Sequence, residues 1–345
     1  MKKRAQLITL YNNKGGVSKT TTLFNLAAYL STIGKKVLIA DCDPQCNVTE
    51  LFYASDEDTY DPTIDLPGTS IYQALKPRLE GEIRQVDVKS VMLSASKLYS
   101  NLYLLRGDLE FALAERYFAN AAAQAITDNI HEKNTYVSLW KLLTGLGEIH
   151  QFDYILCDVG PSTGAITQLT VLACDAFLLP LYPDRFSNQA VQAIGKVLSQ
   201  WISRHKEIAK NLGPYNIEPF PGQPELLGAI IQDFKVHSGT KVKKSYENWL
   251  LKIKANIKDT LLQEDIIVGP NFDPDHPFIA NIRDVGPLAP IAQMFGRAIF
   301  DVQRTDTSEA STTGQAYGGI VWDGWLAREA EYKEEIAKIA GTLPQ

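Results

Sequence analysis

The sequence predicts an α/β fold in which a mostly parallel central sheet is covered by helices on both faces. Short apolar runs of strand length recur along the 345 residues, and the stretches between them are long enough for helices. Strands that alternate with helices are typical of parallel sheets. The first apolar run also leads through a glycine-containing loop into helical periodicity, which indicates the start of a βαβ unit.

The first expected strand covers residues 6–11 (QLITLY) and is followed by the loop sequence NNKGGVSKTT. Leucine and alanine spacing then predicts a helix that ends at Gly34, because glycine is common directly after a helix C-terminus. The next strand, KVLIAD at residues 36–41, completes the βαβ unit. Further strands are expected at residues 102–105, 154–158, 176–181 and 226–231.

Composition predicts a folded chain, because 45% of the residues are hydrophobic and only 21% are charged. No apolar run approaches the roughly 20 residues that a membrane-spanning helix needs. The amino terminus does not resemble a signal peptide, and the four cysteines show neither a CxxC pair nor the spacing of a disulfide framework. We therefore expect a cytoplasmic protein with reduced thiols.

The sequence KGGVSKTT at residues 14–21 predicts a phosphate-binding loop. A glycine-bearing loop between a strand and a helix can direct backbone N–H groups at a phosphate, and the helix N-terminus adds partial positive charge. Lys19 would add a full charge at the β and γ phosphates, and the Thr20 hydroxyl would bind Mg²⁺, which prefers hard oxygen ligands. The residues expected to contact the nucleotide here are Lys14, Gly15, Gly16, Val17, Ser18, Lys19, Thr20 and Thr21.

Two later segments place carboxylates at the ends of predicted strands. Asp43 lies in DCDPQCN, just beyond the second strand, and Asp158 ends the strand YILCD. Ligands of parallel sheets bind at the carboxyl ends of the strands, next to the loops that follow them. We therefore expect Asp43 to lie close to the phosphate loop.

The strict pattern GxxxxGK[ST] is not met, because Asn13 and Ser18 occupy its glycine positions. The loop instead matches the deviant Walker A form KGGxxK[ST]. Together with LIADCDPQCNVTELF (38–52) and FDYILCDVGPSTG (152–164) it resembles the ParA and MinD group of P-loop ATPases. The resemblance implies the three-layer sandwich of P-loop NTPases. It is closest to ParA partition ATPases that lack an amino-terminal helix-turn-helix domain.

The resemblance extends over most of the chain and implies one ATPase domain that covers residues 1–345. Some segments are polar and rich in turn residues, and others have extra length relative to the family. We expect these segments to be loop insertions. They lie near residues 54–69, 116–150, 202–225 and 304–325.

The resemblance also implies a Mg²⁺-dependent ATPase whose two subunits enclose two ATP molecules. Lys14 would reach the partner's phosphates, where a cation supplied in trans stabilises charge on the transferred phosphoryl group. Asp43 would position the attacking water, so Lys14 and Asp43 are the expected catalytic residues. Thr20, Asp43 and Asp158 are the expected residues of the magnesium site. Hydrolysis is expected to be slow and stimulated by a ParB-like partner; Gly160 replaces a proline that family members usually carry after Asp158.

Residues 235–258 form a basic strip with seven lysines and one glutamate, so that its local charge is +6. The whole chain carries −6, which leaves −12 for the remainder. Apolar positions at three- or four-residue spacing predict an amphipathic helix. They are Val242, Tyr246, Trp249, Ile253, Ile257 and Leu261.

A focused basic strip suits DNA binding without sequence specificity, and family members bind nucleoid DNA in this way as ATP dimers. The lysines that would contact DNA are Lys241, Lys243, Lys244, Lys252, Lys254 and Lys258. A solvated lysine-rich helix surface without a ligand explains the same pattern. Both interpretations stay open from the sequence.

Other roles within the same ATPase class remain as alternatives. A MinD-like ATPase binds membranes through a basic carboxy-terminal helix, but residues 325–341 carry three basic and four acidic residues, which suits anionic lipid poorly. A relative of the nitrogenase iron protein needs well-spaced cluster cysteines, whereas Cys42 and Cys46 flank Asp43. A positioning ATPase for a protein assembly would share all the motifs. Gln232 and Asp233 resemble the family's base-contacting region.

Overall fold

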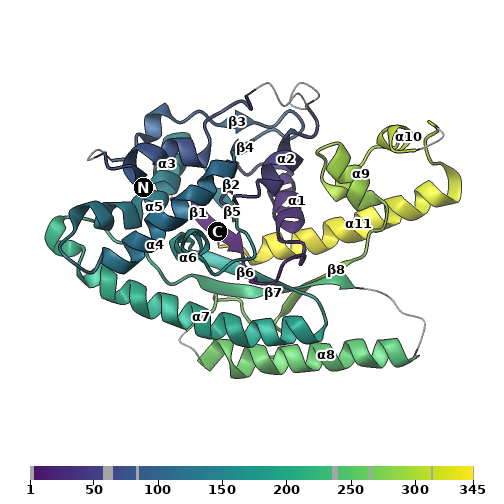
Figure 1. Ribbon diagram of the computed structural model, residues 1–345. Coiled ribbons are helices and arrows are strands. Elements are labelled where there is room, and N and C mark those ends of the chain that lie inside the picture. Colours follow the sequence, from purple (N-terminus) through teal and green to yellow (C-terminus); the bar gives the residue numbers. More distant parts are fainter. Residues whose placement is uncertain are drawn as a thin grey trace.

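Figure 1 shows the computed structural model, which describes residues 4–56, 65–82, 85–234, 240–263, 266–311 and 314–344. One eight-stranded sheet runs through these residues in the order β3-β4-β2-β5-β1-β6-β7-β8. The strands are β1 (Gln6–Leu10), β2 (Val37–Asp41), β3 (Ser94–Ala95), β4 (Leu102–Leu105), β5 (Tyr154–Asp158), β6 (Ala176–Leu181), β7 (Glu225–Phe234) and β8 (Phe278–Arg283). All neighbours pair in parallel except β3, which is antiparallel to β4.

Helices cover both faces of the sheet, as the sequence predicted. One hydrophobic cluster contains residues of α3, α4, α5, α6, α7 and α8, and a second contains residues of α1, α2, α9 and α11. The helices are α1 (Lys19–Thr32), α2 (Asn47–Tyr53), α3 (Ile71–Leu79), α4 (Ala114–Gln124), α5 (Ile130–His150), α6 (Ala165–Ala173), α7 (Arg185–Lys210), α8 (Thr240–Asp259), α9 (Leu288–Met294), α10 (Asp306–Glu309) and α11 (Gly319–Thr342). The fold is therefore a three-layer α/β sandwich.

The strands expected from apolar runs all exist. Each of the inner strands β1, β2, β5 and β6 is almost wholly buried, which explains why their sequences are continuously apolar rather than alternating. β8 was not predicted as a strand. Its sequence FIANIR mixes buried and exposed positions because it lies at the edge of the sheet.

Three of the expected loop insertions contain helices, which corrects the prediction. Residues 116–150 form most of α4 and all of α5, and Phe118, Leu142 and Leu146 from these helices are fully buried in the core. Residues 202–225 include the end of α7, and residues 304–325 include α10 and the start of α11. In the segment 54–69, residues 57–64 lie outside the described part of the chain.

The sheet topology brings the predicted motifs together at the carboxyl ends of the central strands. β1 lies between β5 and β6, and β5 lies between β1 and β2, so the loops that follow β1, β2 and β5 are neighbours. Ligands of open parallel sheets bind outside the carboxyl ends of the strands, at the point where the strand order reverses direction. Among the described residues, no helix is both long and apolar enough to cross a bilayer.

Candidate nucleotide-binding site

The loop between β1 and α1 has the backbone conformation of a phosphate cradle. Gly16 and Ser18 both have positive φ, at 70° and 56°, and α1 begins at Lys19. Ser18 therefore adopts the left-handed conformation that glycine supplies in the strict pattern. The Asn12 side chain links the loop to β6. Its Nδ2 donates to the Pro180 carbonyl at 2.7 Å, and its Oδ1 accepts from the Lys14 N–H at 2.9 Å.

Lys19 lies folded over the loop. Its side chain is buried, and Nζ donates to the carbonyl oxygens of Asn12 at 3.1 Å and Lys14 at 3.3 Å. Burial lowers the pKa of Lys19, and the nearby carboxylates of Asp158 and Asp43 oppose this effect. A phosphate anion at the loop would strengthen the charged form of Lys19 in the same way.

Thr20 and Asp158 form an oxygen pair at the end of β5. The Thr20 hydroxyl donates to Asp158 Oδ2 at 2.8 Å, whereas the buried Oδ1 has no hydrogen-bond partner among the described residues. Burial and the negative charge of Asp41 raise the pKa of Asp158, although the hydrogen bond from Thr20 opposes them. An unpartnered carboxylate oxygen beside a hydroxyl fits Mg²⁺, which takes hard oxygen ligands and would stabilise the charged carboxylate.

The same region holds no ready-made cage for a metal. Among the described residues, no group of three or more His, Cys, Asp or Glu side chains is arranged to hold a metal ion. Mg²⁺ is commonly held by one or two protein groups, with water and substrate phosphates completing the six ligands. The Thr20 and Asp158 oxygens therefore suit a magnesium ion that arrives together with a nucleotide.

Asp43 lies at the entrance to the loop after β2, and Asp41 lies behind it. Asp43 is 6% exposed, and its Oδ1 accepts from the Gln45 N–H at 3.0 Å, which fixes the carboxylate. Asp41 is fully buried and accepts from the Thr49 hydroxyl at 2.6 Å. Burial raises the pKa of Asp41 to about 7, against the hydrogen bonds that it accepts. Asp43 alone of these two lines the cavity described below.

Gly160 leaves room for Asp43. A Cβ atom built on Gly160 would lie 3.0 Å from Asp43 Oδ1, closer than ordinary van der Waals contact. The segment then enters α6, whose first N–H groups are bound by the Glu115 carboxylate from α4. The Ala165 N–H donates to Oε1 at 2.5 Å and the Ile166 N–H donates to Oε2 at 3.1 Å. Sequence reasoning missed Glu115, because this contact joins two elements 50 residues apart.

The Lys14 side chain is bound by residues of the same chain. Its Nζ donates to Asp184 Oδ2 at 2.6 Å and lies 3.4 Å from the Ser187 hydroxyl. The ammonium also lies over the rings of Tyr182 at 5.3 Å and Phe186 at 5.9 Å. Asp184 is the N-cap of α7, where its carboxylate accepts from the Ser187 N–H at 2.7 Å. This partner of Lys14 was not predicted from the sequence.

A cavity of about 550 Å³ joins these groups. Its size lies within the range of small-molecule sites. The lining residues from the phosphate loop and α1 are Gly16, Val17, Ser18, Lys19, Thr20, Thr21 and Asn25. A second part of the lining, called the C-terminal wall below, was not predicted and consists of Ala289, Pro290, Ala292, Gln293, Arg297 and Ile299.

Of the two residues expected to contact a base, Gln232 does not line this cavity. Gln232 is buried against α1, where its Nε2 donates to the Thr22 hydroxyl at 2.9 Å, and it is not part of the described cavity lining. The Asp233 side chain lies outside the described part of the structure. Lys14 and Gly15 stand beside the cavity rather than among its lining residues.

Residues 240–258 of the basic strip form most of the helix α8, which packs along α7 (Figure 1), whereas residues 235–239 lie outside the described part of the structure. The predicted stripe is confirmed at Ile253, Ile257 and Leu261, which are fully buried, whereas Tyr246 and Trp249 are half-buried. Exposed lysines on α8 are Lys244, Lys252 and Lys258; Lys254 is half-buried. The side chains of Lys241, Val242 and Lys243 lie outside the described part of the structure.

Comparisons with known proteins give a consistent assignment. A family model described as an AAA domain matches residues 5–211. The chain is 24% identical over 243 residues to the chromosome-partitioning ATPase Soj of Thermus thermophilus, covering 70% of this chain and 80% of that protein. It is 26% identical over 208 residues to the sporulation initiation inhibitor protein Soj of Bacillus subtilis, covering 60% of this chain and 67% of that protein.

Solved structures support the fold. A protein from Corynebacterium diphtheriae matches with a TM-score of 0.67 at 22% identity, covering 84% of this chain and 97% of that chain. A variant of McdA from Cyanothece in complex with ATP matches with a TM-score of 0.58 at 17% identity, covering 99% of this chain and 98% of that chain. Because the family model matches more than half of the sequence, the chain belongs to the AAA domain family, and it is a P-loop ATPase of the ParA/MinD type.

Proposed function

We propose that this protein is an ATP-dependent dimerising switch that hydrolyses ATP to ADP and phosphate and acts in DNA partition through non-specific DNA binding. The observation that carries the proposal is the cavity of about 550 Å³ in which Lys19, Thr20 and Asp43 meet, with Asp158 bonded to Thr20. This set contains a cation for phosphates, oxygen ligands for Mg²⁺ and a fixed carboxylate. Phosphoryl transfer needs little more than such positioning and charge stabilisation.

The residues of one subunit have distinct tasks in this proposal. The loop N–H groups and Lys19 bind the phosphates, and Thr20 and Asp158 would hold a magnesium ion, which would supply positive charge to neutralise the phosphate oxygens. Asp43 orients the water that attacks the γ-phosphorus. Water adds to phosphorus as the bond to the bridging oxygen of ADP breaks, and the water proton leaves with the released phosphate.

Lys14 links hydrolysis to dimerisation. In one subunit its ammonium is held by Asp184, 2.6 Å away, and its side chain is 24% exposed. Delivery to the partner's phosphates requires Lys14 to leave Asp184, and the negative charge of bound ATP in the partner compensates for the lost ion pair. A dimer assembled through Lys14 should therefore depend on ATP.

Light scattering with Mg²⁺ and ATP, together with phosphate release, tests this mechanism. Asp43→Ala should give a dimer that persists, because ATP is bound but water is not oriented, and its hydrolysis rate should fall at least about 100-fold. Lys14→Ala should stay monomeric. Lys35→Ala, at an exposed lysine outside the cavity lining, is the matched control and should behave as the unchanged protein. A Lys14→Ala dimer that persists with ATP would contradict the proposed role of Lys14.

The cellular part of the proposal rests on the relatives and on α8. A relative from Thermus thermophilus is named a chromosome-partitioning ATPase, and α8 exposes lysines along its length. We propose that DNA binds this face and that a ParB-like protein stimulates hydrolysis. A positioning role for a protein assembly uses the same switch. Stimulation of phosphate release by DNA together with a DNA-binding partner protein, measured against either alone, favours partition.

A further inference from the structure

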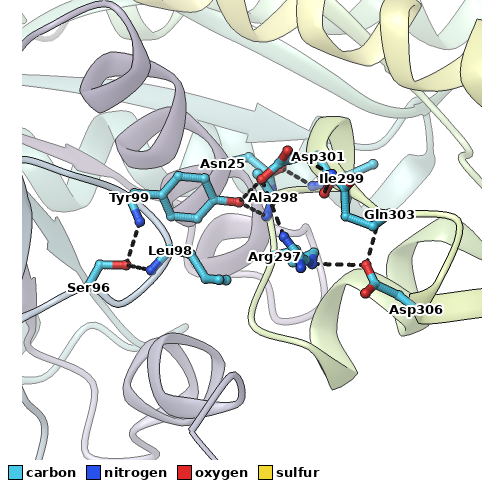
Figure 2. A network of polar contacts seen from close by, with 10 residues as sticks. All are labelled: Asn25, Ser96, Leu98, Tyr99, Arg297, Ala298, Ile299, Asp301, Gln303 and Asp306. Carbon is cyan, nitrogen blue, oxygen red and sulfur yellow. Dashed lines mark hydrogen bonds and ion pairs between the residues drawn. The ribbon is translucent and has the colours of Figure 1, made fainter. Parts of the chain in front are cut away.

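The C-terminal wall of the cavity is attached to the rest of the protein by a polar network whose central groups are buried (Figure 2). We propose that Tyr99 and Asn25 position this wall and thereby set the affinity for nucleotide, although Tyr99 is not among the residues that line the cavity. The inference rests on the proposed function, because it assumes that the cavity binds ATP. It adds two positioning residues that none of the sequence motifs contains.

Two consecutive backbone N–H groups, that of the wall residue Ile299 and that of Ala298 directly before it, are bound by side chains from separate elements. The Ala298 N–H donates to the Tyr99 hydroxyl at 2.8 Å, and the Ile299 N–H donates to Asn25 Oδ1 at 2.7 Å. Ala298, Ile299, Asn25 and Tyr99 are each at most 6% exposed. Water therefore has little access to these N–H groups, and loss of either side-chain oxygen leaves a buried donor unsatisfied.

Asn25 joins the wall to the phosphate-binding helix. Its Nδ2 donates to the Thr21 carbonyl at 2.8 Å, one turn earlier on α1, and both residues line the cavity. The two ends of the amide therefore contact α1 and the C-terminal wall at the same time. A shift of residues 298–299 would therefore strain the hydrogen bonds of Asn25, a residue of α1, the helix that follows the phosphate loop.

Tyr99 is also linked, through Asp301, to Arg297, which is the one cationic residue of the C-terminal wall. The hydroxyl that accepts from Ala298 also donates to Asp301 Oδ2 at 3.0 Å. Asp301 lies 3.8 Å from the Arg297 guanidinium, and Asp306 holds Arg297 Nε at 2.9 Å. Figure 2 shows this chain of contacts from Tyr99 through Asp301 and Arg297 to Asp306. Arg297 lines the cavity, so the hydroxyl acts on the ligand site through a second residue.

The Tyr99 ring is itself held in place. The backbone N–H groups of Tyr99 and Leu98 both donate to the Ser96 hydroxyl, at 3.1 and 3.2 Å, and the Tyr99 ring packs edge-on against Phe24 of α1, with ring centroids 6.4 Å apart. Tyr99→Phe should therefore keep the ring packing and remove only the hydroxyl. None of the groups proposed to bind phosphate or orient water contacts Tyr99 directly in this network. Tyr99→Phe therefore tests the position of the C-terminal wall without changing the residues proposed to bind phosphate or to orient water.

Nucleotide affinity and single-turnover hydrolysis, measured on the full chain with Mg²⁺, test the inference. Tyr99→Phe should raise the Kd for both ATP and ADP by about tenfold, because the wall of the free variant shifts to expose the Ala298 N–H to water and nucleotide binding must reverse that shift, with single-turnover hydrolysis of bound ATP unchanged. Ser96→Ala should raise both Kd values by less and in the same direction. It serves as the milder variant if Tyr99→Phe is poorly folded.

Tyr154→Phe is the matched control. Tyr154 is, like Tyr99, a buried tyrosine of the same hydrophobic cluster that does not line the cavity; its hydroxyl instead donates to the Pro344 carbonyl at 3.1 Å. Its Kd values should stay within about twofold of the unchanged protein. Equal Kd values for the Tyr99→Phe variant and the unchanged protein, or slower hydrolysis of bound ATP in that variant, would overturn the inference alone. Failure of the unchanged protein to bind any nucleotide would instead overturn the proposed function, and the inference with it.

Discussion

At the residue scale, the ion pair between Lys14 and Asp184 is the contact that the proposed switch must break. The Asp184 side chain is 41% exposed, so water screens the pair. Burial works to raise the pKa of Asp184, but hydrogen bonds from Lys14 and Ser187 outweigh it and lower that pKa. The pair therefore favours the monomer by a modest amount, of the order of 0.2–1 kcal/mol for exposed ion pairs.

Asp184→Asn should make dimerisation easier. The amide oxygen can still accept from the Ser187 N–H, because asparagine is as good an N-cap as aspartate, and only the charge that holds Lys14 is lost. We expect the ATP concentration for half-maximal dimerisation to fall roughly two- to fivefold, measured by light scattering. Asp275→Asn removes an exposed ion pair with Lys258 and is the control. A higher ATP requirement for Asp184→Asn would show that Asp184 supports the dimer instead.

At the element scale, a buried histidine joins α5, α7 and the loop before β7. His205 is 3% exposed; its Nδ1 lies 2.9 Å from the Tyr136 hydroxyl and its Nε2 lies 2.9 Å from the Phe220 carbonyl. Since a carbonyl can only accept, the neutral ring carries its proton on Nε2 and accepts at Nδ1. The ring also stacks on Phe220, with centroids 4.3 Å apart. Protonation would place a buried charge among these groups.

Burial lowers the pKa of His205 from 6.5 to about 4. Between these values the unfolded chain binds a proton that the folded chain does not, so stability is full above pH 6.5 and falls as the pH decreases. Urea unfolding at pH 7 and pH 5 should show a loss of about 2 kcal/mol that His205→Gln lacks, because glutamine can donate to Phe220 without titrating. An identical loss in both proteins would mean that other groups cause it.

Elements were predictable where the signal was local, and contacts between distant elements were not. Strand β5 and the phosphate loop follow from residues next to each other in sequence, whereas α9 and Arg297 join the cavity from the far end of the chain. Extra length relative to the family predicted a loop insertion at residues 116–150, but this segment contains α5. Its buried residues Leu139, Leu142, Leu143 and Leu146 have the spacing of a helix that packs on a sheet.

At the scale of the whole molecule, charge is concentrated rather than spread. The chain carries −6 in total, yet α8 exposes Lys244, Lys252 and Lys258. Lys258 is paired with the exposed Asp275 at 3.3 Å, an interaction too weak to prevent a phosphate from replacing the carboxylate. The overall sign of the charge therefore does not exclude DNA binding by one face.

Replacing Lys244, Lys252 and Lys258 together by glutamine should weaken DNA binding by the ATP-bound protein and make the binding constant less dependent on salt concentration. If each lysine contacts one phosphate, the slope of log K against log salt should fall in magnitude by roughly 3. The control replaces the exposed lysines Lys35, Lys89 and Lys97 with glutamine, which changes the net charge equally. Equal slopes in both triple variants would contradict the assignment of α8. Sedimentation with anionic vesicles but not with DNA would favour a membrane-cycling role.

The strand order also sets the intervals between the reacting groups. Asp43 follows β2, Asp158 ends β5 and Lys19 follows β1, and these three strands are consecutive neighbours in the sheet. Adjacent strands lie about 4.8 Å apart, so the starting points of the two outer groups are separated by roughly 10 Å. Backbone hydrogen bonds common to every residue type maintain this interval. A substitution at position 43, 158 or 19 can therefore change the side chain, but it leaves the distances between these three backbone positions unchanged.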